Sequence, residues 1–272
     1  WKKTRLAAAP STVIIIVGEM KMDAVMQFKQ EKEENIQAMN LDPETQRLGK
    51  AFQDQIIEYN YSYNYTWMGR PIIQIPQDIV ALQEAVMKVQ PDLIIETGIA
   101  HGGSLILSAS MMELLDIFAG GTGPKREVVG VDIEIRPHNR TAIEAHPMYR
   151  RITMLEGSST DLKIVAQVES IARQHETIMV LLDSYHTHEH VLKELQCYSP
   201  LVTKGSYVVV YDTVVEFTSH IYQDRPWKKG NNPYTAVQAF LKDNGDFEVD
   251  PIYDRKSVLT SCRGGWLKRI SE

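Results

Sequence analysis

Residues 92–104 constrain the fold more than any other stretch of this chain. A short apolar run, Leu93 to Ile95, ends at Glu96 and leads through three glycines into an apolar helical pattern that begins near Leu105. A buried strand, a glycine-rich turn and a helix are typical of the first unit of a nucleotide-binding α/β domain. The glycines leave room for a ligand to approach the backbone, because a Cβ atom there would collide with it.

The spacing of this turn discriminates between ligands. A dinucleotide site has the order Gly-x-Gly-x-x-Gly, which seats a pyrophosphate on the N-terminus of the helix. This chain has Glu-x-Gly-x-x-x-Gly-Gly instead, with the carboxylate of Glu96 just before the turn. A carboxylate repels a pyrophosphate and suits a cationic ligand with an amino group, so the pattern favours S-adenosylmethionine (SAM) over NAD. The predicted SAM-binding residues of the turn are Glu96, Thr97, Gly98, Ala100, Gly102, Gly103 and Ser104.

Composition limits the class of protein. With 272 residues and 43% hydrophobic content, the chain can form one α/β domain with an N-terminal extension. Its net charge of −6, without a Lys/Arg run, argues against nucleic acid as a partner. Cys197 and Cys262 form neither a metal-binding pair nor a disulfide framework, so a cytoplasmic location is expected. No transmembrane segment is predicted, because a bilayer span needs roughly 18 uninterrupted apolar residues.

We predict three segments along the chain. Residues 1–21 are interpreted as a leader or vector-derived segment, because a basic start and a short apolar core imitate a signal peptide without its cleavage site. Residues 22–91 are predicted to be a helical extension and a substrate or lid segment. Residues 92–272 form the expected SAM-binding catalytic domain.

Within the extension, helical spacing predicts two helices over residues 22–58. Strict alternation of aromatic residues from Tyr59 to Trp67 predicts one extended segment. Asp78 is a candidate N-cap for a helix over 79–89.

The remaining chain alternates strands with helices, which predicts a mostly parallel, seven-stranded sheet covered by helices on both faces. The expected strands are 92–96, 127–132, 151–155, 178–183, 205–211 and 257–262, with 265–269 as an antiparallel strand. The expected helices lie near 103–118, 140–146, 161–174, 187–196 and 233–244.

Acidic residues end the predicted parallel strands. Ligands of such folds bind at this edge of the sheet, and like charges gathered there repel one another unless a cation or ligand hydroxyl offsets them. Asp132, with Ile133 after it, holds the position of the residue that binds ribose hydroxyls; a capping aspartate is the alternative. Ser158 and Ser159 are candidates to face the adenine, although a small turn after a strand has the same appearance.

The segment from Asp183 to His190 contains further candidate metal ligands and a candidate general base. Asp183 is predicted to be a catalytic residue, to contribute to the SAM site and to hold Mg²⁺. Asp212 at the next strand end is predicted to share the ion, with Glu216 near enough to complete the shell. His186 is predicted to be the general base, since imidazole ordinarily titrates close to neutral pH. Two alternatives remain: zinc on His186 and His190 at i, i+4 spacing, or carboxylates that only orient the SAM amine or cap helices. The substrate-binding candidates are Trp67 and Gln74, in or beside a proline-bounded loop, together with Tyr65 and Tyr185.

Three segments, 67–78, 95–104 and 182–191, together with the ending Gly264 to Lys268, resemble the cephalosporin hydroxylase/rhamnosyl O-methyltransferase family. The resemblance spans residues 22–268 and implies a Rossmann-like class I SAM-dependent methyltransferase fold. It also implies methyl transfer to a hydroxyl of a sugar, glycolipid or natural product, often with Mg²⁺. We correspondingly expect a small-molecule or glycolipid acceptor and a homo-oligomer. If the acceptor is a glycolipid, we expect a peripheral membrane location.

The resemblance also implies residue roles. In similar sugar O-methyltransferases the metal is held by an aspartate before the histidine loop and by a Glu-Asp pair on the next strand. Asp183 and Asp212 match this set, and His186 matches the base, but Tyr211 replaces the glutamate, so that Glu216 or water would be the third ligand. The alternatives are a metal-independent SAM enzyme, an accessory protein of antibiotic biosynthesis, or a catalytically silent SAM-binding partner.

Overall fold

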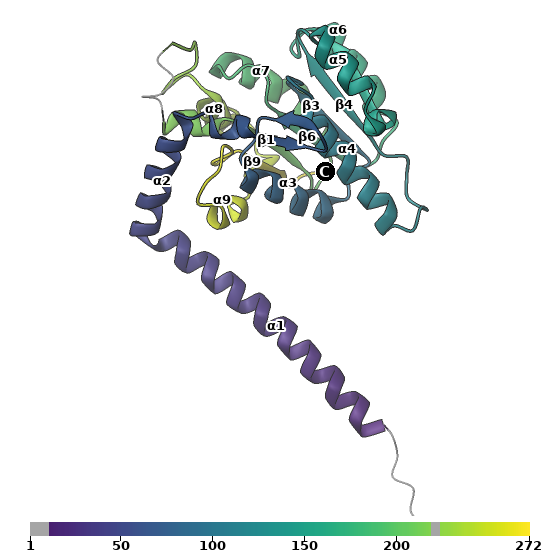
Figure 1. The fold of residues 1–272 in the computed structure, drawn as a ribbon, viewed down its shortest axis with the longest axis vertical. Coiled ribbons are helices and arrows are strands. Elements are labelled where there is room, and N and C mark those ends of the chain that lie inside the picture. Colours follow the sequence, from purple (N-terminus) through teal and green to yellow (C-terminus); the bar gives the residue numbers. More distant parts are fainter. Residues whose placement is uncertain (1–10, 219–223) are drawn as a thin grey trace, which may run out of the picture.

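The computed structural model describes residues 11–218 and 224–272, with side chains from residue 23 onward. A seven-stranded sheet with the order β5-β4-β3-β6-β7-β9-β8 forms its centre (Figure 1). Within this sheet β9 is antiparallel to both of its neighbours, β7 and β8, and the other described strand pairs are parallel. This confirms the predicted mostly parallel sheet and its antiparallel last strand. The strands are β3 (Leu93–Thr97), β4 (Glu127–Asp132), β5 (Ile152–Glu156), β6 (Ile178–Leu182), β7 (Tyr207–Val210), β8 (Phe247–Val249) and β9 (Trp266–Arg269).

Helices cover both faces of the sheet, as predicted. Ile94 and Val128 pack with α3 (Pro76–Val89), α4 (Gly103–Phe118) and α5 (Pro137–Glu144) on one face. Leu93 and Val129 pack on the other face with α6 (Leu162–Ala172), α7 (His188–Tyr198) and α8 (Pro233–Asp243). Because both faces are buried, the central strands are continuously apolar rather than alternating. Short 3₁₀ helices lie at Pro147–Arg151, Ser199–Leu201 and Thr213–Glu216.

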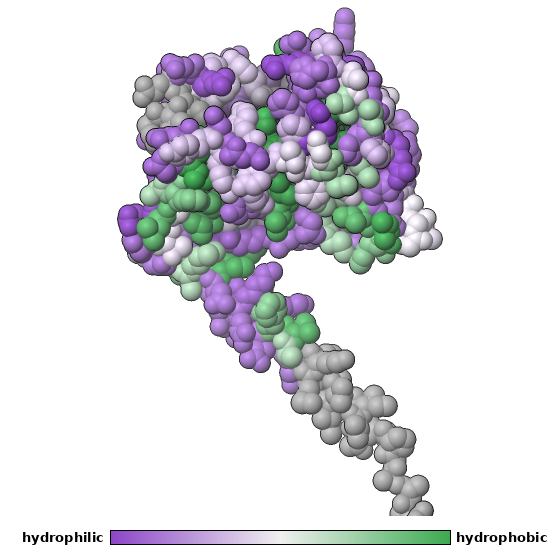
Figure 2. All heavy atoms as spheres, in the orientation of Figure 1, coloured by the Kyte–Doolittle hydropathy of each residue, from purple (hydrophilic) through white to green (hydrophobic). Residues whose placement is uncertain are grey.

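Two helices precede the sheet, in agreement with the helical spacing of residues 22–58. Helix α1 (Ser11–Leu41) projects away from the domain in Figure 1, and α2 (Pro43–Ile57) returns toward it. Asp42 caps α2 by accepting a hydrogen bond from the Thr45 amide. Figure 2 shows that the part of α1 with described side chains is largely hydrophilic, with a small apolar patch. Met26 and Phe28 are exposed apolar residues of this helix. Of the predicted leader, residues 1–10 lie outside the described part of the chain.

The tyrosine-rich segment differs from the prediction. Tyr61–Asn64 form a 3₁₀ turn, and only β1 (Tyr65–Trp67) is extended, pairing with β2 (Arg70–Ile72) in a hairpin. Asn60 before the turn has a φ of 49°, in the left-handed region that asparagine tolerates. The aromatic alternation therefore did not correspond to one strand.

The predicted strand over 257–262 was wrong, as was the N-cap role of Asp78. Ile75 precedes α3 as its N-cap, and Asp78 lies in the first turn with its side chain buried. Its carboxylate accepts hydrogen bonds from the Thr260 hydroxyl at 2.6 Å and from the Ser261 amide at 2.8 Å. Because the polar groups of this segment bind α3, they do not join a β-ladder. The seventh strand of the sheet is β8, which follows α8 and precedes α9 (Ile252–Lys256).

Among the described residues, no helix is long and apolar enough to span a bilayer. Helix α3 packs onto the sheet, so the C-terminal part of the 22–91 segment shares a core with the catalytic domain. The three-segment division and the homo-oligomer stay predictions.

Candidate active site

The glycine-rich turn and the end of β6 lie against each other. Gly98 has a φ of +92°, and a Cβ atom there would lie 2.1 Å from the carbonyl oxygen of Asp183. The Asp183 amide donates to the Thr97 carbonyl at 2.9 Å, which fixes this approach. Only glycine allows both the backbone conformation and the contact, so Gly98 brings the turn next to Asp183.

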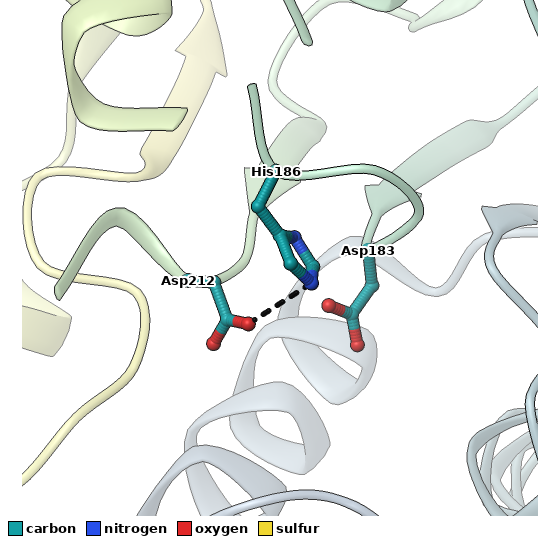
Figure 3. A group of neighbouring side chains, drawn as sticks. All are labelled: Asp183, His186 and Asp212. Atoms are coloured by element: carbon teal, nitrogen blue, oxygen red, sulfur yellow. Dashed lines mark ion pairs between the residues drawn. The ribbon is translucent and has the colours of Figure 1, made fainter. Parts of the chain in front are cut away.

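Asp212 lies opposite, at the end of β7. Its backbone has a φ of 54°, which an aspartate adopts more readily than most residues. Its Oδ2 atom lies 3.2 Å from Nε2 of His186, whereas Asp183 reaches the same space from β6 (Figure 3). Ligand atoms of Asp183, His186 and Asp212 all lie within 4.8 Å of one another. Two carboxylates at this separation fit a small divalent cation, and the imidazole lies beside them.

The electrostatics of the site favour a positively charged ligand. Burial raises the pKa of Asp183 well above its ordinary value, and the nearby Asp212 and Glu96 carboxylates raise it further. Burial also raises the pKa of Glu96 to about 8, although the Ser104 hydroxyl, which donates to this carboxyl group, lowers it. A cation offsets the repulsion among these groups and lets them ionise.

This burial predicts a pH dependence of stability in the absence of ligand. Between the ordinary pKa of 4.5 and the raised value of about 8, Glu96 keeps its proton in the folded protein and loses it in the unfolded chain. The free energy of unfolding therefore decreases as pH rises through this window, by an amount on the order of a few kcal/mol. Glu96→Gln, which is neutral throughout, should flatten this decrease in urea denaturation curves, whereas the exposed Glu248→Gln should not. An equally steep decrease in Glu96→Gln would contradict the assignment.

The glycine-rich turn and the group Asp183, His186 and Asp212 line a cavity of about 500 Å³. It brings together Gln74, the turn residues Gly98, Ala100, Gly103 and Ser104, and the group Asp183, His186 and Asp212. Gln74 is 3% exposed, and its Oε1 has no hydrogen-bond partner among the described residues. Sequence reasoning missed Ile56, Tyr61, Arg225 and Trp227, which also line the cavity. They come from α2, from the 3₁₀ turn Tyr61–Asn64 and from a loop, where no strand end marks a ligand-facing position.

Other predicted SAM-binding residues are absent from the lining of the cavity in the described part of the chain. Asp132 Oδ2 accepts hydrogen bonds from the amides of Ile99 at 2.8 Å and Ala100 at 3.2 Å, so it holds the glycine-rich turn in place. Ser159 Oγ lies 3.1 Å from Nε2 of His190, and Ser158 Oγ lies 3.1 Å from Oγ1 of Thr160. Thr97 and Glu96 are buried in β3, Gly102 packs against Ile143, and Ile133 is exposed.

The structure places several predicted residues away from the cluster. Glu216 accepts hydrogen bonds from the Gly230 amide at 2.8 Å and from Asn232 at 2.6 Å, so its carboxylate braces a loop and does not join the metal group. His190 is likewise engaged by Ser159 and Ser184, which separates it from His186 and removes the zinc alternative based on that pair.

The aromatic substrate candidates are also absent from the cavity lining in the described part of the chain. Trp67 donates from Nε1 to Ser110 Oγ of α4 at 3.2 Å, and Tyr65 packs edge-on against Tyr61. Tyr185 is half-exposed beside Trp227, at 5.6 Å between ring centroids. Trp67 and Tyr65 therefore pack the hairpin, and Trp227 is the tryptophan next to His186, at 4.9 Å.

The strand order, the glycine-rich turn after β3 and the acidic strand ends define a class I methyltransferase fold. The family model described as Rhamnosyl O-methyltransferase/CmcI matches residues 59–270. The chain belongs to this family, which confirms the family resemblance found in the sequence and the prediction of a SAM-dependent O-methyltransferase. Residues 22–58, over which the resemblance was also predicted, lie outside the match.

Relatives and solved structures agree with this assignment. The chain is 30% identical over 213 residues to a rhamnosyl O-methyltransferase of Mycobacterium leprae (strain TN), covering 77% of this chain and 86% of the relative. Among solved structures, one described as "cmcI-D160 Mg-SAM" has a TM-score of 0.54 at 18% identity, covering 77% of this chain and 78% of that one. CalS11, described as a TDP-rhamnose 3'-O-methyltransferase, has a TM-score of 0.50 at 16% identity, covering 85% and 96%. The solved neighbour thus carries the two cofactors predicted for this chain, SAM and Mg²⁺.

Proposed function

We propose that this protein transfers the methyl group of SAM to a hydroxyl of a sugar, in particular a rhamnosyl group carried by a lipid or natural product. The observation that carries the proposal is the group Asp183, His186 and Asp212, which shares one cavity with the glycine-rich turn. The rhamnosyl O-methyltransferase relatives support the choice of sugar.

The donor is proposed to lie along the turn. The amino group of SAM would face Glu96 and Ser104, and its ribose would face Asp132, whose carboxylate already lies at the turn. The adenine would lie toward Ser158 and Ser159. This arrangement leaves the reactive methyl group on the side of the cavity that holds His186.

In the proposed mechanism, His186 Nε2 takes the proton of the acceptor hydroxyl. The oxygen forms a bond to the methyl carbon while the bond from that carbon to sulfur breaks, which leaves S-adenosylhomocysteine (SAH) as a neutral thioether. The Asp212 carboxylate, 3.2 Å from Nε2, stabilises the imidazolium that results. The cavity orients the two reactants, and orientation of this kind can contribute up to roughly 7–11 kcal/mol in well-aligned systems.

Asp183 and Asp212 would hold Mg²⁺, which acidifies and orients a bound hydroxyl. Tyr211 does not replace the missing family glutamate as an anionic ligand, because burial raises the pKa of its phenol well above the ordinary value. Glu216 is engaged elsewhere. Asp183 and Asp212 would therefore be the protein ligands of this ion.

Incubation with methyl-labelled SAM and simple rhamnosides tests this function. We expect label in the glycoside, and loss of transfer on chelation that is restored by Mg²⁺. Transfer that survives chelation would support the metal-independent SAM enzyme instead. Tight SAM binding without transfer to any glycoside would support the silent binding partner.

A further inference from the structure

One wall of the cavity comes from α2. Gln53, Ile56 and Ile57 line the cavity from this helix (α2 in Figure 1). Helix α2 ends at Ile57, and the match to the family model begins at residue 59. This wall is therefore built from a part of the chain that the family model does not describe.

The wall is held firmly against the domain. Gln53 is 3% exposed and donates from Nε2 to the Thr260 carbonyl at 2.9 Å. One turn earlier, a Cβ atom on Gly49 would lie 2.1 Å from Cγ1 of Val258, so the helix and the 257–262 segment are in close contact. That segment is in turn bound to α3 through Asp78. Ile56 and Ile57 thus have a fixed position at the cavity.

The lining residues of the cavity differ in chemistry. Ile56 and Ile57 are apolar lining residues from α2, whereas Asp183 and Asp212 are acidic lining residues that follow β6 and β7. Among the described lining residues, Arg225 is the one lysine or arginine, and its neighbour Asp224 also lines the cavity. A phosphorylated acceptor needs several cationic donors around its oxygens. The lining instead fits an uncharged sugar joined to an apolar group.

We propose that Ile56 and Ile57 are specificity-determining residues, which pack against an apolar group attached to the acceptor sugar. The sugar hydroxyl then lies at Asp183 and His186, and the apolar group lies along α2. This inference rests on the proposed function and adds the part of the chain that selects the acceptor. Because burial of apolar surface is favourable, a sugar with a longer alkyl group should bind and react better than its methyl glycoside.

The test compares hexyl and methyl rhamnoside as acceptors for wild type, Ile56→Ser and Ile57→Ser. In wild type, kcat/KM should be at least about tenfold higher for the hexyl glycoside, through KM. Each serine variant should lose most of this preference, through a higher KM for the hexyl glycoside. Phe52→Ser is the matched control, because Phe52 is an exposed apolar residue of α2 outside the cavity lining.

The affinities of hexyl and methyl rhamnoside for the complex of the protein with SAH can be compared in the same way, without turnover. Equal binding of both glycosides by wild type, or a preference that persists in both serine variants, would overturn the inference. A better reaction with a rhamnose nucleoside diphosphate than with hexyl rhamnoside would also overturn it. If binding depended on the length of the alkyl group but no methyl transfer occurred, the role of Ile56 and Ile57 would be supported and the proposed function contradicted. A failure of the inference can therefore be distinguished from a failure of the proposed function.

Discussion

Asp183→Asn should abolish most methyl transfer while leaving SAM binding nearly unchanged. Asp183 is the carboxylate that β6 presents to both His186 and Asp212, and its amide analogue keeps the shape but loses the charge that holds a cation. Loss of a preorganised charge of this kind lowers kcat by about 10²–10³-fold. Steady-state kinetics together with titration of SAM by calorimetry would measure both effects.

Glu216→Gln is the matched control for Asp183→Asn. The sequence made Glu216 a candidate metal ligand, but its carboxylate binds Gly230 and Asn232. We therefore expect this variant to keep the Mg²⁺ dependence of wild type. Wild-type activity in Asp183→Asn, or loss of Mg²⁺ affinity only in Glu216→Gln, would contradict the proposed ligand set.

His186→Ala should lower kcat by about 10²–10⁴-fold, the usual contribution of a positioned general base. The decrease should be largest near neutral pH, because at higher pH hydroxide or buffer base can partly replace the imidazole. Steady-state kinetics of wild type and variant across pH would measure this decrease. Affinity for SAM should remain unchanged, since the imidazole faces Asp212.

The exposed His138→Asn variant controls for general effects of removing a histidine. It should keep both the rate and the pH profile of wild type. If His186→Ala lost less than threefold in kcat near neutral pH, another group would have to remove the proton.

The centre of the site was predictable from the sequence because parallel strands end at one edge of a sheet. Glu96, Asp183 and Asp212 each follow a continuous apolar run, and Gly98 is required by a backbone contact that repeats in folds of this kind. Strand periodicity and turn chemistry thus sufficed to place these residues near one another.

The residues that the sequence misassigned depend on tertiary contacts. The 257–262 segment has the composition of a strand, yet the buried carboxylate of Asp78 binds its polar groups. Trp67 was predicted to bind the substrate, yet its indole N–H donates a hydrogen bond to Ser110 in α4. Trp227 and Ile56 reach the cavity from a loop and from α2, and no local pattern marks either as facing a ligand. Such positions are decided by how distant segments pack, which local propensity does not encode.

The most direct test of the account is a crystal structure of the protein with SAH and Mg²⁺. We predict an ion bound by both Asp183 and Asp212, with the adenosyl group beside the glycine-rich turn at Gly98. An ion bound away from both aspartates, or SAH bound outside the cavity at Gly98, would contradict the claim that one edge of the sheet holds both the donor and the metal.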